Sequence, residues 1–192
     1  MTTAPAPQLA PPGAGLPRPE LFVARLRFAW VRRRGTRAGF DAQFAQERDR
    51  VLALAAGCSP EQAARRVLIA RLRGMEDSSR HWSVWMTLDH LRITNNAFAG
   101  VITLLGQGKV PPHTASTAAV KPSPDVDAGV VEAFTRSCDD FLRAAAAVPD
   151  LRTAARYTHP WFGPLDAAAW HALGPFHVGL HRRQIERILA AA

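Results

Sequence analysis

The chain has 192 residues and a mass of 20.9 kDa, which favours a single domain. Hydrophobic residues make up 47% and charged residues 21% of the sequence, with a formal net charge of +8, and this globular balance excludes a wholly disordered chain. Residues 1–19 lack the features of a secretory signal, no apolar run is long enough to span a membrane, and the two cysteines are too far apart for a disulfide framework, so we expect a cytoplasmic protein.

The first third of the sequence predicts a tail followed by helices. Residues 1–19 are rich in alanine, proline and glycine, and we expect a flexible, disordered tail there, before one helical domain at residues 20–192. Apolar residues at helical spacing predict helices at residues 20–34 and 40–56. Ser59, Pro60 and Gln62 form the start signal of a third helix over residues 61–73, in which Ser59 is the cap and Gln62 closes a capping box.

Long helical patterns continue to the end of the sequence. The longest predicted helix covers residues 79–105, and a loop rich in glycine, proline, serine and threonine follows at residues 106–124. Helices are expected again at residues 125–147 and 166–191, the last one interrupted at Gly174 and Pro175 because proline removes a backbone donor and crowds the preceding turn. With almost no strand alternation, the pattern predicts an all-α fold, a helical bundle.

The positive charge is concentrated near the first predicted helix, and it comes almost entirely from arginine. There are 22 arginines and two lysines, and the densest run surrounds the apolar segment 21–31: Arg25, Arg27, Arg32, Arg33, Arg34 and Arg37. Such a run is typical of a surface that binds phosphates, of an interfacial helix, or of the solvated face of a packed helix. No nucleic-acid recognition module accompanies it, so nucleic acid is not indicated as a partner. The apolar side of the segment would suit a homodimer contact.

Three of the seven histidines lie on apolar helix stripes. His177 and His181 are four residues apart, so both project from one face of the last helix, and His90 lies on the apolar side of the helix at residues 79–105. A buried imidazole is costly unless it is hydrogen-bonded, paired or coordinated, so the spacing fits either a shared metal ion or ordinary core histidines. Val178 follows His177, which excludes the His-Glu-x-x-His pattern of metalloproteases.

Two motifs of the sequence together are similar to those of a known family. The first is Trp82-Ser83-Val84 followed by Thr87-Leu88-Asp89-His90-Leu91. The second runs His159-Pro160-Trp161-Phe162-Gly163-Pro164-Leu165, then Trp170, then His177-Val178-Gly179-Leu180-His181-Arg182-Arg183-Gln184-Ile185. In order and spacing they resemble the signatures of the DinB-like (DinB/YfiT) superfamily, and the resemblance covers about residues 40–192.

The resemblance implies a four-helix bundle, with the helix at residues 20–34 as an extra N-terminal element. It also implies a divalent metal ion (Zn, Ni, Mn or Fe) held by His90, His177 and His181. Three protein nitrogens leave one coordination position open, as in catalytic sites. The implied activity is that of a metal-dependent transferase or hydrolase acting on a small substrate, with a low-molecular-weight thiol as a candidate co-substrate.

Four further residues are candidates for the site. Asp89, Met86, Thr94 and His159 are candidates for lining the site, and no residue is assigned as catalytic. Met86 stands near a position where the superfamily often has an acidic residue, and Pro175 makes the direction of the following turn uncertain.

One alternative function is a non-catalytic binding or stress-associated module whose basic N-terminal helix docks an acidic partner or a membrane surface. Another is a degenerate relative whose histidines only pack and hydrogen-bond.

Overall fold

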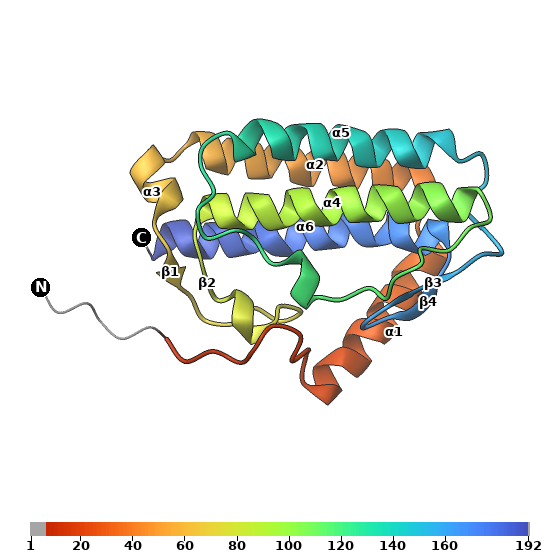
Figure 1. Ribbon diagram of the computed structural model, residues 1–192, viewed down its shortest axis with the longest axis horizontal. Helices are drawn as coiled ribbons and strands as arrows, with labels where there is room; N and C mark the ends of the chain where they lie inside the picture. The colour runs from red at the N-terminus through yellow and green to blue at the C-terminus, as the bar shows by residue number, and fades with distance from the viewer. Residues whose placement is uncertain (1–6, 192) are drawn as a thin grey trace, which may run out of the picture.

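Four long helices lie side by side in the computed structural model of the protein, which describes residues 7–191 (Figure 1). They are α2 (Arg37–Ala56), α4 (Val84–Gly106), α5 (Val130–Ala147) and α6 (Ala167–Ala190). Helix α4 packs against both α5 and α6, and α2 packs against α6 and α5. The predicted four-helix bundle is therefore confirmed, and the helices that carry His90 and the His177–His181 pair are neighbours in it.

Large apolar side chains from all four helices fill the centre of the bundle. The rings of Phe44 on α2 and Phe141 on α5 stack with their centroids 4.4 Å apart, and both side chains are completely buried. Other side chains with no exposed surface come from α4, α5 and α6: Leu88, Leu91, Ile102, Leu105, Phe134, Ile185 and Ile188. Each such side chain contributes roughly 1.5–3 kcal/mol relative to an exposed one, so this core fixes how the helices face each other.

Side-chain caps set where the helices begin. Thr36 accepts a hydrogen bond from the Gly39 amide at the start of α2, and Ser83 and Asp166 cap α4 and α6 in the same way. Each cap satisfies an amide that has no partner within the helix, an effect of about 1 kcal/mol. The predicted capping box at Ser59 is confirmed.

The predicted helix at residues 61–73 is wrong beyond its first turn. Helix α3 covers only Pro60–Ala64, and strand β1 (Val67–Leu68) follows it and pairs antiparallel with β2 (His81–Trp82). The Ile69 amide continues this pairing by donating to the carbonyl of Arg80, and the Ile69 side chain is buried. Branched residues favour the extended backbone, and here their contact with a distant segment outweighs local helix propensity.

The same pairing shortens the next helix. Residues 81 and 82 belong to β2 and are preceded by a short 3₁₀ helix, η1 (Asp77–Ser79), so α4 begins at Val84 rather than at residue 79. A second 3₁₀ helix, η2 (Ala118–Val120), lies in the predicted loop at residues 106–124. Helix α5 likewise begins at Val130, five residues later than predicted.

A second small hairpin precedes α6 where a loop was predicted. Strands β3 (Tyr157–His159) and β4 (Gly163–Leu165) pair antiparallel, with His159 opposite Gly163. Gly163 has a φ of 73°, which only glycine adopts without strain, so it suits the tight turn at this position. Strands β3 and β4 lie at one end of the bundle, near α1 (Figure 1).

The predicted interruption of the last helix at Gly174 and Pro175 is wrong, because α6 is continuous from Ala167 to Ala190. Pro175 lacks the amide that would bond to the His171 carbonyl, but only one hydrogen bond of a 24-residue helix is lost in this way. The helix is held on two sides, by α2 and α4, and Gly174 lies directly against the ring of Phe141. Tertiary packing therefore keeps the helix together through the proline.

Helix α1 (Arg18–Arg34) lies outside the four-helix bundle and runs at an angle to it (Figure 1). Its Phe28 is buried against the rings of Phe162 and Phe176, and Arg25 donates a hydrogen bond from Nε to the carbonyl of Trp161. The opposite face is apolar and exposed, with Phe22, Val23, Leu26 and Trp30 each more than half accessible. The predicted docking or homodimer role of this helix stays a prediction.

The segment before α1 makes specific contacts with the rest of the chain. The amides of Ala10 and Gly13 donate hydrogen bonds to the carboxylates of Asp77 and Glu76. Residues 1–6 of the expected tail lie outside the described residues. Among helices in residues 7–191, none has both the length and the apolar character needed to cross a membrane.

A pair of glycine-to-alanine substitutions tests how α6 packs. A methyl group at Gly174 would lie 2.4 Å from the Phe141 ring, which is itself locked in the core, so Gly174→Ala is expected to lower the free energy of unfolding by about 1–3 kcal/mol. At Gly100 on α4 no atom lies within 4 Å of an added methyl group, so Gly100→Ala is expected to raise stability by about 0.5–1 kcal/mol. Urea unfolding of both variants measures the difference, and equal effects would contradict this packing.

Candidate metal centre

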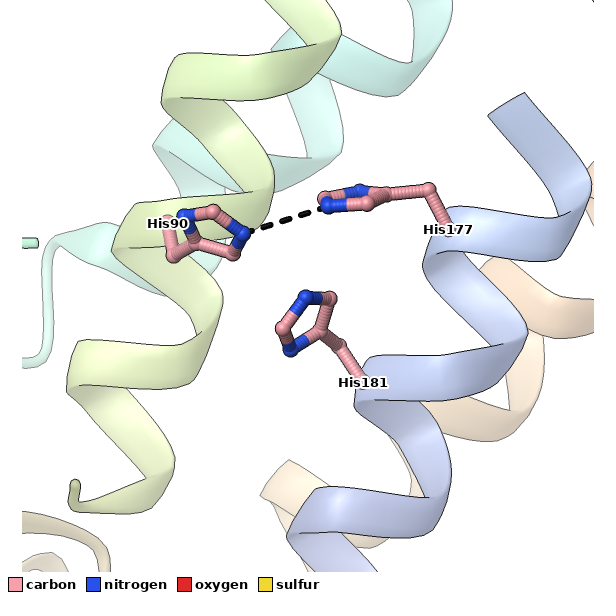
Figure 2. Close-up of side chains that lie close together, drawn as sticks. All are labelled: His90, His177 and His181. Atoms are coloured by element: carbon pink, nitrogen blue, oxygen red, sulfur yellow. Dashed lines mark hydrogen bonds between the residues drawn. The ribbon is translucent and has the colours of Figure 1, made fainter. Parts of the chain in front are cut away.

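Three imidazole rings from two neighbouring helices meet at one point. His90 projects from α4, and His177 and His181 project from successive turns of α6 toward it (Figure 2). One ring nitrogen from each residue lies within 4.8 Å of the other two, and the Nε2 atoms of His90 and His177 are 3.2 Å apart. His90 and His181 are buried, with 6% and 4% of their surfaces exposed, and His177 is half-buried. We refer to these three residues as the histidine cluster.

The second ring nitrogen of His90 and of His181 is held by a hydrogen-bond acceptor. His90 Nδ1 lies 2.6 Å from the carbonyl oxygen of Val120, which can only accept, so the proton is on Nδ1. His181 Nδ1 lies 2.6 Å from Oε1 of Gln184. The amide group of Gln184 is itself oriented, because its Nε2 donates to the carbonyl of Ser79. Both imidazoles therefore carry their proton on Nδ1 and leave Nε2 with a free lone pair.

The ring of His177 is oriented by a contact between its Nδ1 atom and the hydroxyl of Thr94. The Thr94 hydroxyl can donate its single proton to the backbone carbonyl of His90, one turn earlier on α4. The two oxygen atoms are 2.9 Å apart. When the proton is placed there, the hydroxyl oxygen accepts from His177 Nδ1, 3.4 Å away. With this tautomer of His177 all three Nε2 atoms are unprotonated and free to bind a cation. With the other tautomer, His177 donates from Nε2 to His90 Nε2, the pair joined by the dashed line in Figure 2.

This donor set fits a divalent metal ion. Neutral imidazole is a ligand for Zn, Ni and Fe, and a ligating histidine usually donates its other N–H to a carbonyl or a carboxylate, as the cluster does here. Two nitrogens bound to one tetrahedral zinc ion lie about 3.3 Å apart, close to the separation of the His90 and His177 Nε2 atoms. The three lone pairs thus converge as metal ligands converge.

Burial keeps the cluster neutral. Desolvation lowers the pKa of His90 to about 4, against an ordinary value of 6.5. It also lowers the pKa values of His177 and His181 well below that value; His181 and His90 add to the effect on His177, and His90 adds to the effect on His181. At neutral pH all three rings can therefore offer lone pairs without first losing a proton.

One wall of the cluster is aromatic and is fixed by a loop. The Trp82 ring stacks on His181 with centroids 6.0 Å apart, and it also contacts His90. Lys121 lies over the Trp82 ring and forms an ion pair with the buried Glu76. This ion pair holds the segment whose Val120 carbonyl orients His90. The wall excludes water from one side of the cluster.

On its other side, the cluster opens into a cavity of about 1010 Å³. Of the predicted site-lining residues, Thr94 and His159 line this cavity. The backbone amide of Trp161 donates to His159 Nδ1, so in the neutral ring the proton of His159 is on Nε2, the opposite tautomer from the cluster. Burial lowers the pKa of His159 to about 4, which keeps this ring neutral.

Asp89 and Met86 do not line the cavity. The Asp89 carboxylate accepts hydrogen bonds from Arg92 and from the Ser123 amide, so it holds the same loop that carries Val120. Met86 is buried in the first turn of α4, where its amide donates to the Ser83 cap. Asp89 thus acts on His90 only through the backbone.

Sequence reasoning named Thr94 as a site-lining candidate but missed the other groups that orient the imidazoles. Gln184 is part of the second motif, and its position three residues after His181 places both side chains on one helix face, a signal that could have identified it. The carbonyls of Val120 and Ser79 carry no signal in the sequence, because any residue has a carbonyl group. They can be found only from the path of the folded chain.

The chain's own thiols are not activated. Burial raises the pKa of the Cys138 thiol to about 12, and burial also raises the pKa of the half-buried Cys58. Neither cysteine lines the cavity. Because the thiolate is the reactive form, neither residue has the environment of a nucleophilic cysteine.

Comparison with known proteins gives one family and one fold. The sequence model of the DinB superfamily matches residues 43–185, which leaves α1 outside the match. The crystal structure of TT2238, a four-helix bundle protein, is similar with a TM-score of 0.57 and 19% sequence identity, over 79% of this chain and 98% of that chain. At that identity the likeness concerns the fold alone. No curated protein matches the sequence.

The neutral, buried cluster predicts a dependence of stability on pH. Between pH 6.5 and pH 4 the unfolded chain binds a proton at His90 that the folded chain does not, so the free energy of unfolding of the metal-free protein falls as the pH falls. His90 alone accounts for about 2 kcal/mol at pH 5. Urea unfolding in the presence of a chelator measures this loss, which should be smaller in His90→Gln. Stability that is constant from pH 7.5 to pH 5 would contradict the buried neutral state.

Proposed function

The chain belongs to the DinB superfamily, and we propose that it binds one divalent metal ion through His90, His177 and His181 and uses it as a metal-dependent enzyme acting on a small substrate. The observation that carries the proposal is the convergence of three ring nitrogens at one point, while the Nδ1 atom of each ring has a separate hydrogen-bond partner. The open cavity beside them supports an enzyme rather than a closed structural site.

The alternative of a metal-free relative leaves part of the cluster without a protein partner. His177 can donate from Nε2 to His90 Nε2, but the Nδ1 protons of His90 and His181 are used outside the cluster. His181 Nε2 would then depend on water from the cavity. A bound cation would accept a lone pair from all three rings at once, which favours metal binding over packing alone.

The residues around the cluster divide the work of such an enzyme. A bound divalent ion with three nitrogen ligands supplies Lewis acidity at its open position, which lowers the pKa of a bound water or thiol. His159 holds a proton on Nε2 beside the cavity and can donate a hydrogen bond to a substrate. Because Cys58 and Cys138 are not activated, the nucleophile comes from water or from a substrate thiol. A thiol-dependent transferase and a hydrolase both meet these conditions.

The ligand types narrow the choice of metal. The cluster offers three imidazoles and no carboxylate, a set that suits Zn, Ni and Fe better than Mn, which favours oxygen ligands. We therefore propose zinc, nickel or iron as the bound metal.

Metal analysis of the purified protein tests the proposal directly. Protein prepared without chelators should contain about one equivalent of metal, and His181→Gln should lose most of it because two nitrogens hold an ion far more weakly than three. His171→Gln is the matched control: His171 is equally buried on the same helix but faces Asp41. Elemental analysis that finds no metal in the wild type, or the same content in His181→Gln, would refute the proposal.

A second variant tests the orienting role of Gln184. Gln184→Met keeps the volume of the side chain but removes the acceptor for His181 Nδ1, so metal affinity should fall by about 10–100-fold. Competition with a metal-chelating dye measures the affinity. Gln107→Met makes the same chemical change on the exposed end of α4 and should leave the affinity unchanged. An affinity within twofold of the wild type in folded Gln184→Met would show that the hydrogen bond does not orient the ligand.

A further inference from the structure

The charged groups that line the cavity beside the cluster differ in whether they have partners within the protein. Three carboxylates line it, those of Glu20, Glu47 and Glu76, and each one is already neutralised by a cation. Glu20 pairs with Arg71 and also accepts from the Gly74 amide, Glu47 pairs with Arg182, and Glu76 pairs with Lys121. The negative groups of the cavity are therefore all engaged within the protein.

Three arginines on the same cavity are not engaged in this way. Arg27, Arg73 and Arg183 line it, and none of them forms an ion pair or a side-chain hydrogen bond with another residue in the described range 7–191. All three are exposed on its solvent side. After the internal pairs are counted, the charge that remains free around the cavity is positive.

Two of these arginines flank one contact between α6 and the segment that precedes η1. Arg183 lies three residues after Leu180 on α6, so the two side chains are neighbours on the helix surface. The neighbour of Arg73, Gly74, lies against Leu180 on the turn of α6 that precedes Arg183, with 3.7 Å between the position of an added Cβ and a methyl group of Leu180. Arg27 is two helical turns beyond Glu20 on α1, on the helix face that Glu20 presents to the cavity.

The remaining wall of the cavity is largely aromatic. Phe28 of α1, Phe98 of α4, and Trp170 and Phe176 of α6 all line it. Apolar walls with a few polar groups at fixed positions are typical of a site for a small organic ligand, in which the walls bind the body and the polar groups select its orientation. Arg27 and Phe28 come from a helix that the superfamily match does not include.

We propose that the substrate of the metal centre is an organic anion: an apolar body that fills the aromatic part of the cavity and a carboxylate, sulfonate or phosphate that Arg73 and Arg183 bind. Arg27 adds positive charge further along the cavity and makes α1 part of the selectivity for this class of ligand. The inference rests on the proposed function for its reaction, but the anion site itself needs only the cavity and its unpaired arginines. Guanidinium groups suit such anions because they present parallel N–H donors.

Two fluorescent probes with the same apolar body test the proposal. Anilinonaphthalenesulfonate carries a sulfonate, and phenylnaphthylamine is the same molecule without it. The wild-type protein, as purified and again after removal of metal, should bind the anionic probe at least about tenfold more tightly. Arg73→Gln combined with Arg183→Gln should weaken the anionic probe by about tenfold and leave the neutral probe within about twofold.

Matched variants locate the binding and control for net charge. Arg152→Gln combined with Arg156→Gln removes the same charge from exposed positions outside the cavity and should change neither affinity. Ala97→Trp, on an exposed position that lines the cavity, should weaken both probes. Leu26→Ser, on the exposed face of α1, should weaken neither.

The outcomes separate this inference from the proposed function. Equal affinity of the wild type for the two probes, or equal losses in the two double-arginine variants, would overturn the anion site. So would a loss of both probes in Leu26→Ser, which would place the binding on the outer face of α1. An arginine-dependent preference in a protein that binds no metal would support the anion site and refute the metal-dependent function, and metal binding without the preference would do the reverse.

Discussion

Contact between α4 and α6 is the constraint on which the candidate site depends. These helices bring His90 within 3.2 Å of His177 through their Nε2 atoms, in an environment that holds the imidazoles neutral. Neutral rings alone do not make a metal site, because an imidazole can present either nitrogen. Here the Val120 carbonyl, the Gln184 side chain and the Thr94 hydroxyl each bind one Nδ1, so that three lone pairs face the same point.

The parts of the chain outside the four-helix bundle serve this arrangement. The hairpin of β1 and β2 ends beside Ser79, whose carbonyl orients Gln184, and it places Trp82 against the cluster. The loop after α4 is held by Lys121 and Ser123, and this fixes the Val120 carbonyl directly before them in the chain. Strand β3, the turn that follows it and α1 also contribute residues to the lining of the cavity. The short elements outside the bundle therefore orient the side chains of the candidate metal centre, which lies between two bundle helices.

Much of the fold could be predicted from helical periodicity and caps, but contacts between distant segments could not. The four bundle helices follow from their apolar stripes, and Ser59 marks a helix start correctly. Residues 65–73 are not helical, because residues 67–69 within them pair with the distant segment 80–82. Likewise Pro175 does not break α6, since the packing of Gly174 on Phe141 is a tertiary contact. The ligand set was inferred from motifs, whereas the backbone acceptors that orient it and the charge of the cavity required the folded chain.

A crystal structure of the protein grown with zinc, with diffraction measured at the zinc absorption edge, tests the central claim most directly. The account predicts one anomalous peak that lies roughly 2.0–2.1 Å from the Nε2 atoms of His90, His177 and His181, with their Nδ1 atoms still bonded to Val120, Thr94 and Gln184. A peak at other residues, or imidazoles bridged only by water in the presence of the metal, would contradict it.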